Sequence, residues 1–75
     1  MKLHLKIGQL IYEKNMTIVA FSKKSGIPLS TLSGILQGKQ IKNMSLRTTL
    51  AIADTLDMSI YDLIKGTEYE KNAYL

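Results

Sequence analysis

Apolar residues recur along the chain at helical spacing, and glycine, proline and capping residues interrupt them. Ile7, Leu10 and Ile11 follow an i, i+3, i+4 pattern, which predicts a first helix from about Leu5 to Lys14. The apolar alternation from Met1 to Ile7 is also compatible with a short strand, so the pattern leaves both structures open at the N-terminus.

The next part of the chain predicts two helices joined by a tight turn. Thr17 is a suitable N-cap, Gly26 a suitable helix end in a left-handed conformation, and Pro28 fits the first turn of the following helix. The two predicted helices span about Ile18–Ser25 and Pro28–Gln37, and Gly38 ends the second.

A polar loop, Lys39–Met44, separates these helices from two more. Ser45 is a predicted N-cap for a helix over about Leu46–Leu56, with Leu46, Leu50, Ala53 and Leu56 as its buried stripe. Ser59 and Asp62 form a capping-box-like pair that opens a short fifth helix, and Gly66 ends it.

The pattern therefore predicts an all-α fold, a compact bundle of five short helices in one domain over residues 1–66. With 75 residues the chain is near the lower limit for a self-sufficient core, so every helix must bury apolar surface. We expect one contiguous core that contains Phe21, Ile27, Leu32, Ile35, Leu50, Leu56 and Leu63.

The composition narrows the classes of protein further. The chain has no cysteine, which fits a reducing cytoplasm and leaves no disulfide or thiolate metal site. Its apolar runs are too short for a membrane span, and the N-terminus has no secretory signal pattern. We expect a cytoplasmic protein with no cofactor, no bound metal and no membrane or small-molecule partner. We do not expect an enzyme, because no nucleophile, paired carboxylates or phosphate loop has a suitable setting.

Charge is distributed unevenly along the chain. The net charge is +4, and every charged residue from Lys14 to Ala53 is basic, whereas acidic residues outnumber basic ones from Asp54 onward. A basic segment centred on a helical hairpin suits a protein with one face toward a polyanion such as DNA. A solvated, lysine-rich surface is the plain alternative.

The segment Thr17–Lys39, TIVAFSKKSGIPLSTLSGILQGK, has the layout of a DNA-binding helix-turn-helix. With IGQLIYEKNMT before it and MSLRTTLAIADTLDMSIYDLIKG after it, the chain resembles the lambda-repressor-like helix-turn-helix family of the Cro/repressor (Xre) type. The resemblance covers about Ile7 to Lys65.

This resemblance implies that residues 28–37 form the recognition helix, which lies in the major groove of double-stranded DNA. The base-contacting residues carried over by position are Leu29, Ser30, Ser33 and Gly34. The resemblance also implies phosphate contacts at Gln37 and Lys39 and at backbone amides near Thr17 and Ser45. To these we add Lys23, Lys24 and Thr31 as phosphate-contacting candidates. The alternatives for these side chains remain open: Ser30, Thr31 and Ser33 also suit the polar face of a surface helix, Lys23 and Lys24 suit solvated cations, and Arg47 suits either role.

Three departures from the family pattern matter. Ile18 occupies a position where glutamine commonly reaches a phosphate, and Ser25 is polar where the family is usually apolar. Residues 28–36 contain no Arg, Lys, Asn or Gln, so the bidentate pairings that distinguish guanine or adenine are missing from this helix.

The sequence thus predicts a small sequence-specific transcriptional regulator, a phage-like repressor or Cro-like protein. One recognition helix contacts few base pairs, so we expect a homodimer, with the tail 67–75 and its Tyr69, Tyr74 and Leu75 as the candidate dimer contact, together with the fifth helix. The alternative is a protein-interaction module on the same fold, an antitoxin or accessory subunit with weak or no DNA binding.

Overall fold

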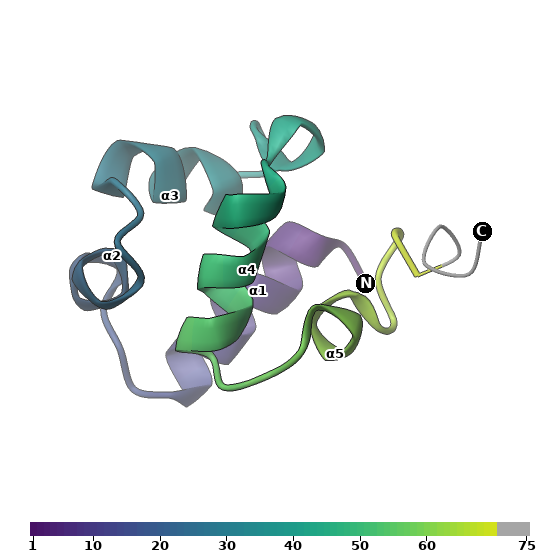
Figure 1. The fold of residues 1–75 in the computed structure, drawn as a ribbon, viewed down its shortest axis with the longest axis horizontal. Coiled ribbons are helices and arrows are strands. Elements are labelled where there is room, and N and C mark those ends of the chain that lie inside the picture. The colour runs from purple at the N-terminus through teal and green to yellow at the C-terminus, as the bar shows by residue number, and fades with distance from the viewer. Residues whose placement is uncertain (71–75) are drawn as a thin grey trace.

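The computed structural model describes residues 1–70, and over this range the secondary structure is helical (Figure 1). The elements are α1 (Leu3–Glu13), α2 (Ile18–Ser25), α3 (Leu29–Leu36), a single turn of 3-10 helix η1 (Ile41–Asn43), α4 (Leu46–Thr55) and α5 (Ile60–Ile64). The predicted all-α bundle is confirmed, and the N-terminal strand alternative is wrong because α1 already begins at Leu3. No helix within residues 1–70 has the length and apolar character needed to cross a membrane.

One hydrophobic cluster holds these elements together. α1 packs against α3 and α5, while α2 packs against α3 and α4. The side chains buried in this cluster are Leu3, Ile7, Ile11, Phe21, Ile27, Leu32, Ile35, Ile52, Ala53, Leu56 and Leu63. Every residue of the predicted core belongs to it except Leu50.

The predicted buried stripe of α4 is wrong at its first two positions. Leu46 is 69% exposed and Leu50 is 44% exposed, whereas Ile52 and Thr55 are buried in their place. The helix is rotated so that a threonine-containing face turns inward. Thr55 tolerates burial because its hydroxyl donates a hydrogen bond to the Ala51 carbonyl oxygen at 2.7 Å.

The helix ends follow the local chemistry of the sequence. The side chains of Thr17, Ser45 and Ser59 accept hydrogen bonds from Ala20, Thr48 and Asp62 N–H groups and thereby cap α2, α4 and α5. Pro28 occupies the N-cap position of α3 rather than its first turn. The predicted polar loop after α3 contains η1, and Ile41 and Met44 of this region pack against the core.

Two observations favour glycine at position 38, directly after the C-cap residue of α3. Its φ of +80° lies in the left-handed region, and a Cβ at this position would lie 3.0 Å from the His4 ring. The turn that Gly38 makes leads into η1 and the start of α4, which lie near the C-terminal end of α3 (Figure 1).

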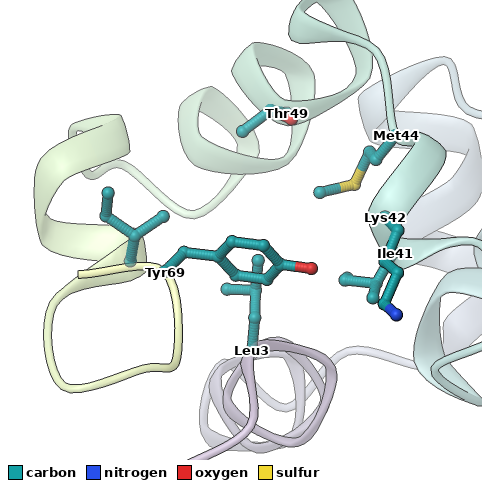
Figure 2. A pocket seen from close by; sticks show the side chains of 7 residues that line it. Leu3, Ile41, Lys42, Met44, Thr49 and Tyr69 are labelled. Carbon is teal, nitrogen blue, oxygen red and sulfur yellow. The ribbon is translucent and has the colours of Figure 1, made fainter. Parts of the chain in front are cut away.

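The residues after α5 pack back onto α1. Thr67 is buried, and the Tyr69 ring lies over Leu3, with its hydroxyl end toward Ile41 and Lys42 (Figure 2). The same side chains border an open hollow of about 320 Å³. Tyr69 therefore makes contacts within its own chain, whereas Tyr74 and Leu75 lie outside the described residues.

Glu68 joins the two ends of this structure. Its carboxylate accepts a hydrogen bond from Leu3 N–H at 2.7 Å, at the open N-terminal end of α1. Desolvation raises the pKa of Glu68, but hydrogen bonds from the backbone N–H groups of Glu68 and Leu3, with the charges of Lys2 and His4, outweigh it. The pKa of Glu68 is therefore lowered from its ordinary value of 4.5.

We expect this carboxylate to make stability pH-dependent in the acid range. Because the pKa is lowered by folding, the ionised form stabilises the fold above the unfolded-state pKa, and this stabilisation is lost as the pH falls through the folded-state pKa. Thermal melts of Glu68→Gln at a series of pH values from neutral to about 2 should therefore fall less steeply than those of the wild type. Parallel curves for the two proteins would contradict the assignment.

Candidate nucleic-acid interface

The solvent-facing side of α3 is the centre of the candidate interface. Leu32 and Ile35 point into the core, and helical periodicity places Ser30, Gly34 and Gln37 on the opposite side. In Figure 1, α3 runs along the edge of the bundle, with η1 and the first turn of α4 near its C-terminal end.

The predicted base-contacting residues occupy this face unequally. Ser30 is exposed, and Leu29 exposes nearly half of its surface at the N-terminal end of the helix. Ser33 is half-buried, and its hydroxyl accepts a hydrogen bond from Gln37 Nε2 at 3.1 Å. Ser33 and Gln37, predicted for base and phosphate respectively, are thus paired with each other.

Gly34 is not open to solvent in the way the sequence suggested. The Gln40 side chain lies over it, with its Cδ and Nε2 atoms both 3.1 Å from the place that a Cβ of residue 34 would occupy. Gln40 itself is exposed. Sequence reasoning missed Gln40. The signal that could have indicated it is a glycine on the outward face of α3, six positions before a glutamine.

The helix-turn-helix turn is fixed by two serines. Ser22 Oγ donates a hydrogen bond to the Ile27 carbonyl oxygen at 2.5 Å, and Ser25 Oγ accepts one from Ile27 N–H at 3.3 Å. Gly26, between Ser25 and Ile27, has a φ of +78°. The polar residue at position 25 therefore holds the turn backbone.

The predicted backbone phosphate contacts fall at the N-termini of two helices, α2 and α4. Thr17 Oγ1 accepts from Ala20 N–H at 3.0 Å, and Ser45 Oγ accepts from Thr48 N–H at 3.1 Å. Each cap leaves the first N–H groups of its helix without intrahelical partners, which favours an anion there. At α2 these amides lie beside the exposed side chain of Ile18, which cannot hydrogen-bond a phosphate.

A surface groove separates α3 from the N-terminal half of α4. Two hollows in it share Thr31 and Thr48; Gln40 and Asn43 border one, and Arg47 with the helix-turn-helix turn borders the other. Thr31 is half-buried in this groove and does not lie on the outward face of α3. The structure thus brings Arg47 beside the helix-turn-helix, although the sequence left its role open.

The exposed cations around α3 are free of acidic partners within residues 1–70. Lys14 pairs with Asp57 at 3.5 Å, which takes one cation out of the acid-free segment. The remaining cations of that segment are exposed and form no salt bridge with a described residue: Lys23, Lys24, Lys39, Lys42 and Arg47. Lys39 directly follows the Gly38 turn at the C-terminal end of α3, and its N–H donates to the Gly34 carbonyl oxygen.

Comparison with protein families decides how this arrangement is classified. Residues 6–68 match the family model of the Cro/C1-type HTH DNA-binding domain. The chain belongs to this family. The predicted resemblance is confirmed, and α2 with α3 is the helix-turn-helix of the Cro/C1-type domain. A search of curated proteins found no match.

Proposed function

We propose that this Cro/C1-type domain is a sequence-specific transcriptional repressor that binds operator DNA as a homodimer, with residues 28–37 in the major groove. The observation that supports this most directly is the solvent-facing side of α3, which is bordered by Lys39 and Arg47, two cations without acidic partners among the described residues. Such cations can neutralise phosphates on either side of a helix in the groove.

In this proposal Leu29, Ser30, Ser33 and Gly34 face base edges. Leu29 can contact a thymine methyl group, while the serine hydroxyls make single hydrogen bonds that distinguish bases weakly. The phosphate contacts come from Lys23, Lys24, Thr31, Gln37 and Lys39 and from the amides after Thr17 and Ser45. Arg47, at the edge of the same groove, joins them.

A homodimer gives such a domain its useful specificity, because two copies read two half-sites. The proposed dimer contact is α5 with the tail 67–75. Tyr69 is half-buried against its own subunit, so α5 is the main candidate within the described residues. Repression then requires only that the dimer occupy its operator.

A protein-interaction role is the second candidate. The exposed pair Leu46 and Leu50, one helical turn apart on α4, favours it because adjacent apolar side chains suit a protein partner. Selection of binding sites from randomised duplex DNA separates the two functions. A repressor should enrich a two-fold symmetric sequence with half-sites about 10 base pairs apart or a multiple of that, whereas a pure interaction module should enrich nothing.

Substitution of Ser30 tests whether the face of α3 contacts DNA. Ser30→Asp should weaken binding to the selected duplex by about tenfold or more, because a carboxylate in the groove meets the negative potential of DNA. The neutral, similarly shaped Ser30→Asn is the matched control and should keep most of the affinity. Residue 30 is exposed in the first turn of α3, where an acid suits the helix dipole. Both variants should therefore melt like the wild type. Equal affinities of the Asp and Asn variants would remove α3 from the interface.

A further inference from the structure

The recognition helix lacks a side chain that reads adenine or guanine by paired hydrogen bonds. Gln40 lies outside the helix, at the N-cap position of η1, yet its carboxamide lies over Gly34 on the outward face. We propose that Gln40 is a specificity-determining residue of this domain. Its carboxamide occupies the space left by the missing side chain at Gly34 and from there reads an adenine. This inference rests on the proposed DNA-binding function.

The backbone between the two residues explains how Gln40 reaches this place. Gly38 turns the chain in the left-handed conformation, and Lys39 N–H then donates to the Gly34 carbonyl oxygen at 3.0 Å. The next residue, Gln40, is thereby held beside Gly34. Its own carbonyl oxygen accepts from Asn43 N–H at 3.2 Å, which fixes it to η1.

The position at 34 must be small for this arrangement. A Cβ there would lie 3.1 Å from Cδ and Nε2 of Gln40 and 3.3 Å from its Cγ, closer than side chains ordinarily pack. The glycine weakens the middle of α3 by roughly 1 kcal/mol relative to alanine. The space that it leaves is filled by a carboxamide.

The carboxamide also has its hydrogen-bonding groups free. Within residues 1–70 the Gln40 side chain has no hydrogen-bond partner, in contrast to Gln37, whose Nε2 donates to Ser33, and Gln9, whose Nε2 donates to Glu13. A glutamine amide can pair with adenine through two hydrogen bonds: Nε2 donates to N7, and Oε1 accepts from the N6 amino group. Among these three glutamines, Gln40 is the one on the α3 face with both groups available.

The test uses selection from randomised duplexes and affinity measurements on the selected site. The wild type should prefer adenine at one position of each half-site, and Gln40→Ala should lose that preference with an affinity loss of about 5- to 150-fold per half-site contact. Gln40→Glu should shift the same position toward cytosine, because a carboxylate accepts from cytosine N4. Gln9→Ala on α1 is the matched control and should change neither the preference nor the affinity.

Gly34→Ala supplies an independent arm. Its methyl group requires the carboxamide to move by a few tenths of an ångström, so it should weaken the same adenine preference, and the double variant Gly34→Ala/Gln40→Ala should resemble Gln40→Ala alone. All variants are first compared by thermal melting. Because Gln40 is exposed, its replacement should leave the fold intact.

Three results would overturn the inference. Unchanged base preferences in Gln40→Ala would do so, as would a uniform loss of affinity with no change of preference, which indicates a phosphate or packing role. In both cases the wild type still selects a site, so the proposed function survives. A wild type that selects no sequence from the pool would overturn the inference and the proposed function together.

Discussion

Leu32→Ala is expected to lower the free energy of unfolding by about 2–5 kcal/mol. Leu32 has 0% of its surface exposed and lies on the inward face of α3, in the cluster that contains Phe21 and Ile35. Its truncation leaves a cavity that rigid neighbouring helices fill only in part. A domain of this size has a small total stability, so the loss is a large share of it.

Leu50→Ala is the matched comparison, since it removes the same atoms from a leucine that is 44% exposed on α4. It should cost less than about 1 kcal/mol, because only part of the side chain leaves an apolar environment and alanine is a good helix former. Urea unfolding of both variants measures the difference. If Leu50→Ala proves as destabilising as Leu32→Ala, the orientation of α4 described above is incorrect.

These two leucines also illustrate what the sequence could and could not predict about the fold. The ends of α2 were predictable because a capping threonine and a left-handed glycine act locally, and the structure places the helix at Ile18–Ser25 as expected. The buried face of α4 was not predictable, because its sequence offers two alternative stripes, one with leucines and one with threonines. The leucine stripe is more apolar, but threonines that bond their hydroxyls to the preceding turn can be buried as well.

The candidate site shows the same limit at longer range. The outward face of α3 follows from helical periodicity, so Ser30 could be placed from the sequence. The pairing of Ser33 with Gln37 and the position of Gln40 over Gly34 depend on side-chain geometry and on the path of the chain after Gly38. Arg47 could not be assigned either, because its position beside the helix-turn-helix turn depends on how α4 packs against α2.

Binding to the selected duplex is expected to depend steeply on salt. If a dimer neutralises about eight phosphates, a plot of log K against log salt concentration should have a slope near −7. Affinity should then fall by about 10⁴-fold between 50 and 200 mM salt. The cations proposed to act here are exposed and without acidic partners among residues 1–70, so they bring their full charge to the DNA.

Lys39→Ala should reduce the steepness of that slope by about 2 for a dimer, because each subunit loses one phosphate contact worth about 0.9. Lys14→Ala is the control: it removes the same charge from the end of α1, where Lys14 pairs with Asp57 at 3.5 Å and belongs to neither the proposed DNA contact nor the proposed dimer contact, and it should leave the slope nearly unchanged. The comparison separates a local phosphate contact from the effect of net charge, which falls equally in both variants. A slope near zero for the wild type on every duplex would contradict DNA binding. Equal slopes for the two variants would show instead that Lys39 attracts DNA only through the overall charge of the protein.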